Sequence, residues 1–171
     1  TLYRMASGNV SGARMDLETY VQRYYLEKIL QSANRRFYEM SAGQFELRMY
    51  ELEKAGEGKN RGLDLMVYSN VTGKEREVRT LSGGESFMAA LSLALGMADQ
   101  IQESSSAIRL DMMFIDEGFG SLDEHSRSQA VRVLQKMAGG SRLIGIISHV
   151  TELKQEIEDQ LFVRKYETGS L

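Results

Sequence analysis

The chain has 171 residues, enough for one domain with a sizeable core, and carries a net charge of −3 with 26% charged residues. This balance excludes a strongly basic nucleic-acid-binding domain and an acidic disordered chain, so any contact with DNA must come from a local patch. The absence of cysteine excludes disulfides and thiolate metal sites, and the cytoplasm is the expected location. No apolar stretch approaches the roughly 20 residues that cross a bilayer, which excludes membrane insertion.

The first 40 residues predict a loop followed by a long helix. Residues 1–16 are small, polar and contain glycine, so we expect weak order there. Apolar residues then recur three and four positions apart over residues 16–40, as on a helix that packs against a core. The tyrosines of this helix could instead mark a partner surface, because tyrosine is common at interfaces. The apolar set is Leu17, Tyr20, Val21, Tyr24, Ile29, Leu30, Ala33 and Phe37.

An antiparallel meander is predicted next. Polar and apolar residues alternate over residues 44–50 and 63–68, which predicts two half-buried strands. A solvated loop over residues 54–62 joins them, and a turn at residues 70–74 leads into a third strand over residues 75–80. Lys74, Arg76 and Arg79 could contact phosphate. Because Glu75 and Glu77 lie between them, a mixed, solvated edge strand is favoured.

From residue 85 onward, helices and strands alternate. We expect helices at residues 85–102 and 124–138, a short helix at 151–158, and strands at 112–115, 143–147 and 160–164. The first two strands are apolar and are expected to be fully buried. The order β-α-β-α-β predicts an α/β fold with a parallel sheet and flanking helices, preceded by the meander.

Two adjacent carboxylates, Asp116 and Glu117, end the strand over residues 112–115. Ligands of open α/β sheets lie beyond the carboxyl ends of the strands, where a phosphate-bound metal would be held. Side chains alternate along a strand, so the two should point to opposite faces. One could then ligate Mg²⁺ while the other reaches an attacking water. An exposed turn, which often carries Asp or Glu, is the competing interpretation.

Leu81-Ser82-Gly83-Gly84-Glu85 stands directly before the predicted helix at residues 85–102. Ser82 and Glu85 have the spacing of a capping box, which explains those two residues. It does not explain Gly83 and Gly84, since each glycine costs about 1 kcal/mol relative to alanine inside a helix. Bare backbone at a helix N-terminus lets amide groups approach an anion, so a phosphate site is favoured over a cap alone.

These two stretches resemble motifs of ABC-type ATPases. Leu81 to Glu85 resembles their signature motif, and Met112 to Glu117 resembles their Walker B strand. The resemblance implies that Asp116 binds Mg²⁺, that Glu117 orients the attacking water and that His149 is the switch histidine. It also implies that Ser82, Gly83, Gly84 and Glu85 contact ATP in trans, and that a D-loop contains Ser121 and Asp123.

The loop after Glu117 narrows the resemblance. Gly118-Phe119-Gly120-Ser121-Leu122-Asp123 is similar to the SbcC family of coiled-coil ATPases, as are residues 17–21 and 33–37. The resemblance implies an ATP-dependent complex with the nuclease SbcD that cleaves double-stranded DNA ends and hairpins in repair and recombination. Further implied partners are an N-terminal Walker A lobe of the same full-length chain and a second SbcC copy, the two copies enclosing two ATP molecules.

A P-loop, which needs the pattern G-x-x-x-x-G-K-[ST], is missing from the sequence. The Gly-Lys pairs at residues 58–59 and 73–74 lack both the first glycine and the final Ser or Thr. We therefore interpret residues 1–171 as one C-terminal ATPase lobe, inactive alone. Its parts are a residual linker from a coiled coil (1–16), a packing helix with the meander (17–80), and the signature helix, Walker B strand, D-loop and switch histidine (81–165).

Two other functional classes stay open. One is half of an SMC-like or other ABC-type ATPase in chromosome organisation or transport, and the other is an α/β binding domain without nucleotide chemistry. Outside the family context, Asp123 would be an ordinary helix N-cap and His149 an ordinary loop residue. His125 lies in no motif and is expected to be exposed.

Overall fold

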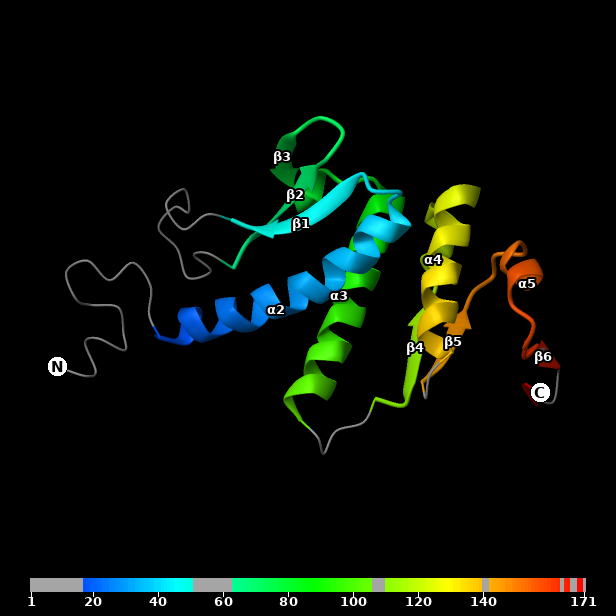
Figure 1. The fold of residues 1–171 in the computed structure, drawn as a ribbon. Coiled ribbons are helices and arrows are strands. Elements are labelled where there is room, and N and C mark those ends of the chain that lie inside the picture. The colour runs from blue at the N-terminus through cyan, green and yellow to red at the C-terminus, as the bar shows by residue number, and fades with distance from the viewer. Residues whose placement is uncertain are drawn as a thin grey trace, which may run out of the picture.

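The computed structural model describes residues 17–50, 63–105, 110–139 and 142–163, with the backbone of residues 165–166 and 169–170. The predicted linker over residues 1–16 and the loop over residues 54–62 lie outside the described residues. Two long helices, α2 (Leu17–Met40) and α3 (Gly83–Ser104), cross next to an antiparallel sheet, and a parallel strand pair with helix α4 (Glu124–Ala138) lies beyond α3 (Figure 1). The α/β architecture is as predicted.

Helices α2 and α3 approach each other closely because a glycine lies at their crossing. A Cβ atom on Gly96 would lie 2.7 Å from the carbonyl oxygen of Ile29 and 3.0 Å from the amide nitrogen of Ala33. Bare backbone at this point lets the C-terminal half of α2 bury Leu30, Ala33 and Phe37. This half carries the packing role predicted for the whole helix.

The N-terminal half of α2 does not pack into the core. Tyr20 is 58% exposed, and Leu17, Val21 and Tyr24 are exposed as well, so their predicted burial is wrong. Figure 1 gives the reason: this half of α2 extends beyond α3, where no other described element covers it. Helical periodicity identified the apolar face correctly but could not tell where the covering helix ends.

The meander has the predicted antiparallel order. Strands β1 (Phe45–Met49), β2 (Leu65–Ser69) and β3 (Lys74–Glu77) pair as β1-β2-β3, with Leu47 opposite Val67. Both of those side chains are buried. The Asn34 side chain of α2 holds β1 through hydrogen bonds to the amide nitrogen and carbonyl oxygen of Leu47, each 2.8 Å. The third strand is shorter than predicted, because Val78–Thr80 forms a 3-10 turn that leads the chain into α3.

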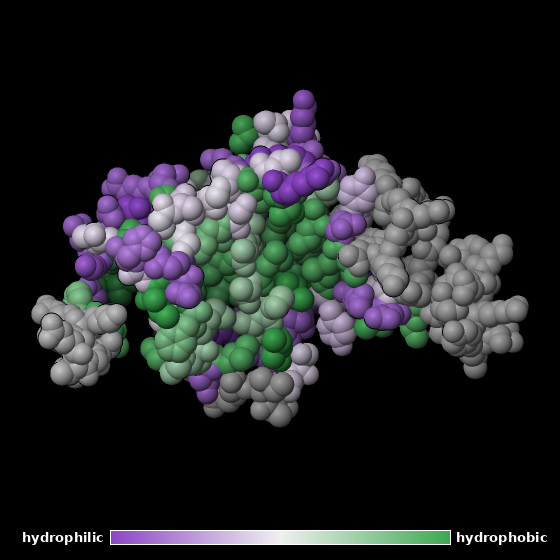
Figure 2. All heavy atoms as spheres, turned by 180° about the vertical axis from the view of Figure 1, so that it is seen from behind, coloured by the Kyte–Doolittle hydropathy of each residue, from purple (hydrophilic) through white to green (hydrophobic). Residues whose placement is uncertain are grey.

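Strands β4 (Met112–Asp116) and β5 (Leu143–Ile147) pair in parallel, with α4 against one face (Figure 1). The prediction that both strands are fully buried is wrong, since Phe114 is 63% and Ile147 54% exposed. Burial needs both faces covered, and among the described residues only one face is. Seen from behind, apolar side chains gather across the middle of the molecule (Figure 2). Exposed apolar residues of these strands are Met112, Phe114, Leu143 and Ile147.

The predicted last strand over residues 160–164 is also wrong. Helix α5 spans only Leu153–Glu156, and residues 160–163 form no regular element. The Gln160 side chain donates to the carbonyl oxygens of Lys154 (2.7 Å) and Ile157 (2.6 Å), which holds the chain in a bend. The short strands β6 (Lys165–Tyr166) and β7 (Gly169–Ser170) pair only with each other. No helix in the described ranges is long and apolar enough to cross a membrane.

An ion-pair network joins α2, α3 and the segment before β5. Asp99 Oδ2 lies 2.6 Å from both the Ser32 hydroxyl and Arg36 Nη2, and Arg142 Nη1 lies 3.5 Å from Asp99 Oδ1. Burial raises the pKa of Asp99, but the hydrogen bonds from Ser32 and Arg36 and the charges of both arginines outweigh it, so the pKa is lowered. The ionised carboxylate therefore stabilises the fold.

We predict that Asp99→Asn lowers the free energy of unfolding by about 2 kcal/mol at neutral pH, because it leaves two partly buried arginines without their counter-charge. A group with a depressed folded pKa stabilises above its unfolded pKa of about 3.9 and loses that effect as pH falls through the folded value. The wild-type advantage should therefore shrink below about pH 4. Urea denaturation at several pH values measures it, with exposed Glu103→Gln as control. A difference that grows in acid would contradict the assignment.

Candidate nucleotide-binding site

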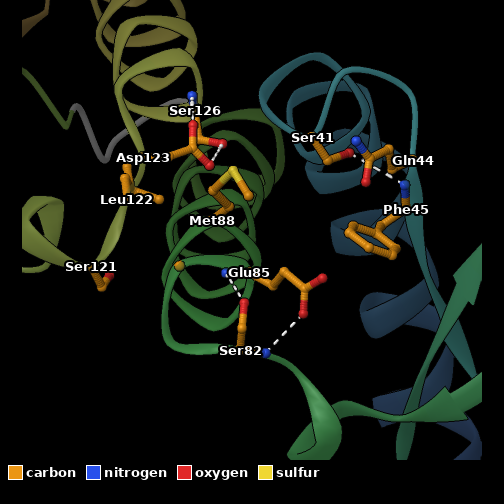
Figure 3. Close-up of a pocket in the computed structure, with 11 residues that line it drawn as sticks. Ser41, Gln44, Phe45, Ser82, Glu85, Met88, Ser121, Leu122, Asp123 and Ser126 are labelled. Atoms are coloured by element: carbon orange, nitrogen blue, oxygen red, sulfur yellow. Dashed lines mark hydrogen bonds between the residues drawn. The ribbon is translucent and has the colours of Figure 1, made fainter.

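The signature-like segment begins α3 with a complete capping box. The Ser82 hydroxyl accepts a hydrogen bond from the Glu85 amide (3.3 Å), and the Glu85 carboxylate accepts one from the Ser82 amide (2.8 Å; Figure 3). The capping interpretation is thus confirmed. Ser82 is exposed and stands at the rim of a pocket, so its hydroxyl remains accessible. The pocket is lined by Ser41, Gln44, Phe45, Ser82, Gly84, Glu85, Met88, Ser121, Leu122, Asp123 and Ser126.

Gly84 is required for a close contact that the sequence does not reveal. A Cβ atom at this position would lie 2.8 Å from the backbone carbonyl oxygen of Ser121, in the 3-10 turn Phe119–Ser121 that follows β4. A Cβ on Gly83 would meet only the Ser121 Cβ at an ordinary 3.6 Å. The two neighbouring glycines therefore differ, and Gly84 lets the first turn of α3 pack on the D-loop-like segment.

A second tight contact lies one turn further along α3. Gly118 has φ +97°, and a Cβ there would lie 2.1 Å from the ring of Phe87. The Phe87 ring also packs edge-on against Phe119, with centroids 5.0 Å apart. The Ser121 hydroxyl donates to the Gly118 carbonyl (2.7 Å), which closes the loop on itself. The loop after β4 is therefore fitted to α3 along two helical turns.

Glu117 and His149 lie together at the carboxyl ends of the two parallel strands. Glu117 Oε2 is 2.8 Å from His149 Nδ1, and the Glu117 amide donates to the Ile147 carbonyl (2.8 Å). Glu117 has φ +59°, an uncommon conformation for a residue other than glycine. The sequence predicted that strand alternation alone would separate it from Asp116. The left-handed backbone of Glu117 instead turns its side chain toward β5.

Asp116 is the last residue of β4 and is exposed. By alternation it shares the uncovered face of the strand with Phe114 and Met112, which are also exposed. The described residues contain no group of three or more His, Cys, Asp or Glu side chains that could hold a metal. This single carboxylate fits Mg²⁺, which often binds proteins through one or two carboxylates and otherwise through phosphates and water.

Asp123 caps α4, as its competing interpretation proposed. Its carboxylate accepts hydrogen bonds from the amide (2.8 Å) and the hydroxyl (3.1 Å) of Ser126. The amide bond is the main cause that lowers the pKa of Asp123, so the cap is ionised at neutral pH. Asp123 lines the same pocket as Ser82, whereas His125 is exposed, as expected.

Two contacts at this site went unnoticed in the sequence. Phe87 was assigned only to the inward face of its helix, and Arg76 to a mixed, solvated edge strand. The ion pair of exposed Arg79 with Glu77 agrees with a solvated edge. Arg76 instead contacts the Glu85 carboxylate of the signature segment at 3.1 Å. A basic residue near a capping-box glutamate was the available signal.

Comparisons with known proteins agree with this arrangement. A family model described as SbcC/RAD50-like, Walker B motif matches residues 61–136. The SbcC subunit of the SbcCD nuclease from Vibrio cholerae is 49% identical over 170 residues, which cover 99% of this chain and 17% of the relative. Its counterpart from Lactococcus lactis is 44% identical over 172 residues, which cover 98% and 16%. The chain thus spans about a sixth of the length of these relatives.

Solved structures share the fold at low sequence identity. A structure described as "Structural biochemistry of ATP-driven dimerization and DNA stimulated activation of SMC ATPases" has a TM-score of 0.66 at 17% identity, covering 90% of this chain and 86% of that chain. The SMC head domain from Thermotoga maritima has a TM-score of 0.55 at 18% identity, covering 88% and 49%.

The fold is therefore that of a lobe of an SMC- or ABC-type ATPase head. Within this class, the chain carries an SbcC/RAD50-like Walker B region, and its resemblance to SbcC is confirmed by the curated relatives.

We predict that Gly84→Ala lowers the free energy of unfolding by about 1–3 kcal/mol, because the new methyl group forces the Ser121 backbone away. Gly83→Ala is the matched control in the same helical turn and should be neutral or stabilising by up to about 1 kcal/mol. Urea denaturation of both variants measures the difference. Equal effects would mean that the steric fit of Gly84 does not contribute to stability.

Proposed function

We propose that this chain forms the C-terminal half of the ATPase head of an SbcC protein, acting in ATP-dependent cleavage of double-stranded DNA. The observation that carries the proposal is the packing of the signature segment on the loop that joins Glu117 to Asp123. One rigid lobe thereby presents a signature segment and a carboxylate–histidine pair, the two parts that a head of this class applies to different nucleotides. The 49% identity to the SbcC protein of a known nuclease supports the assignment.

The second lobe of the head would cover the open face of the β4–β5 pair. Phe114, Leu143 and Ile147 are exposed there, and contiguous apolar surface of this kind marks an interface. The sequence has no P-loop, so the phosphate cradle has to be supplied by another segment. We assign this role to an N-terminal Walker A lobe of the same full-length chain. Asp116 lies on this face, at the edge where that lobe would bring the phosphates.

The residues of this chain fit a role in ATP hydrolysis. Mg²⁺, when bound, would neutralise charge on the phosphate oxygens, and Asp116 would hold it. Glu117 would orient the attacking water, with His149 placing the carboxylate through their 2.8 Å contact. Ser82 and the backbone of Gly83 and Gly84 would contact the γ-phosphate held by a second copy. ATP would thus draw two heads together.

The remaining partners follow from the relatives. They are named as part of the nuclease SbcCD, which supports SbcD as the nuclease partner and double-stranded DNA ends or hairpins as substrate in the cytoplasm. A chromosome-organising SMC-like ATPase is the second candidate, because solved SMC heads share the fold. The Gly118-Phe119-Gly120 loop and the higher identity to SbcC proteins favour the first candidate.

We predict that the lobe alone does not hydrolyse ATP, whereas the full-length chain with both lobes does. In that chain Glu117→Gln should lower kcat by about 10²-fold or more, since the water loses its carboxylate. Asp116→Ala should abolish Mg²⁺-dependent turnover. Phosphate release measures both, with exposed Glu158→Gln as control. Steady turnover by the lobe alone, removed by Glu117→Gln, would refute the half-site proposal.

We predict further that Ser82→Arg in the full-length chain retains ATP binding but loses ATP-dependent dimerisation. The long side chain would project from an exposed helix N-terminus into the interface, so the lobe should remain folded. Size-exclusion chromatography with a slowly hydrolysed ATP analogue measures dimerisation, and circular dichroism checks folding. Ser82→Ala is the companion variant, expected to cost about 1 kcal/mol of stability through loss of the cap. A Ser82→Arg protein that dimerises normally would reduce Ser82 to a helix cap.

A further inference from the structure

Arg76, on the edge strand of the meander, contacts both ends of the signature segment. Its Nη1 donates to the carbonyl oxygen of Thr80 (3.1 Å), immediately before the segment. Its Nη2 lies 3.1 Å from each carboxylate oxygen of Glu85, at the segment's end. One guanidinium group therefore fixes the distance between the two ends of Leu81-Ser82-Gly83-Gly84. We infer that Arg76 is a positioning residue that sets the orientation of Ser82 toward the nucleotide of a second copy.

The contacts continue from Arg76 to the serine itself. Glu85 Oε2, which faces Arg76, also accepts the hydrogen bond of the Ser82 amide (2.8 Å). The Glu85 amide in turn donates to the Ser82 hydroxyl (3.3 Å). Rotation of the Glu85 side chain would break the contact to the Ser82 amide. Arg76 restrains that rotation and acts on Ser82 through Glu85.

Arginine suits this position better than lysine. A guanidinium carries several donors in a rigid plane, whereas an ammonium group is a single point charge and cannot hold two acceptors in a fixed geometry. The guanidinium carbon also lies 5.2 Å from the ring centroid of Phe45 on β1, which ties it to the sheet. The side chains of Arg76 and Glu85 are 35% and 23% exposed, so solvent screens this ion pair only in part.

This inference rests on the proposed function, in which Ser82 binds the γ-phosphate held by another copy. Arg76 makes no contact with β4, β5 or the loop between Glu117 and Asp123 that the structure records. Its loss should therefore leave ATP binding by the Walker A lobe intact while misplacing Ser82. The expected consequence is a lower kcat and weaker ATP-dependent dimerisation, with KM unchanged.

Arg48 provides a matched control on the same sheet. It pairs with Glu46 (3.3 Å) and Glu75 (3.5 Å) and stacks on the Tyr68 ring at 3.7 Å. These contacts resemble those of Arg76 in kind, yet none of them reaches the signature segment. Arg48→Ala removes the same charge and the same type of stacking contact. Any effect specific to Arg76→Ala then belongs to the signature contact.

The experiment uses the full-length, two-lobe protein as wild type, Arg76→Ala, Arg76→Lys and Arg48→Ala. Hydrogen exchange without nucleotide is measured first over residues 80–88. Arg76→Ala should exchange faster there, Arg76→Lys should be intermediate, and Arg48→Ala should match wild type. This readout does not depend on ATP. Unchanged exchange in Arg76→Ala, or an equal increase in Arg48→Ala, would overturn the inference.

ATPase kinetics and ATP-driven dimerisation follow on the same proteins. Arg76→Ala should lower kcat roughly ten- to hundredfold with KM unchanged, because small displacements of binding groups have effects of this size. Arg76→Lys should recover part of the loss. Faster exchange with wild-type kcat and dimerisation would also overturn the positioning role. Failure of wild type itself to hydrolyse ATP or dimerise would refute the proposed function, while the exchange result would still judge the Arg76 contact.

Discussion

The contact between the first turns of α3 and the loop after β4 determines the geometry of the candidate site. No space remains between them for a side chain at Gly84, which faces the Ser121 carbonyl, or at Gly118, which faces the Phe87 ring. Packed groups at such distances move together, since interiors of this density do not deform freely. The signature segment and the loop carrying Glu117 are therefore one mechanical unit. A displacement of one by a bound nucleotide would be transmitted to the other.

The strand pair separates two carboxylates that are adjacent in sequence. Asp116 ends the regular strand on the open apolar face, beside Phe114. Glu117 adopts a left-handed backbone and turns to His149 at the end of β5. Backbone strain of this kind persists where the surrounding structure imposes it and is concentrated at functional sites. One carboxylate is thus available to a second lobe and the other is held within this one, as a composite site requires.

The sequence predicted elements better than it predicted burial. Helix α4 has the predicted bounds, and β5 and the meander are close to them, because periodicity and turn residues are local signals. Phe114 and Tyr20 were expected to be buried and are exposed, since burial depends on what covers a face rather than on the pattern of that face. The steric role of Gly84 was equally hidden, because it depends on a carbonyl group distant in sequence.

Capping and phosphate recognition by Ser82 were treated as competing interpretations of the sequence, and the geometry makes them compatible. In the cap the Ser82 hydroxyl only accepts, from the Glu85 amide at 3.3 Å. A hydroxyl has one donor proton in addition to its acceptor lone pairs, so the cap leaves that proton free for an anion. The cap also fixes the direction of the oxygen, which lowers the entropy lost on binding. A capped serine followed by bare glycine backbone is therefore a preorganised phosphate contact, and the helix dipole acts in the same direction.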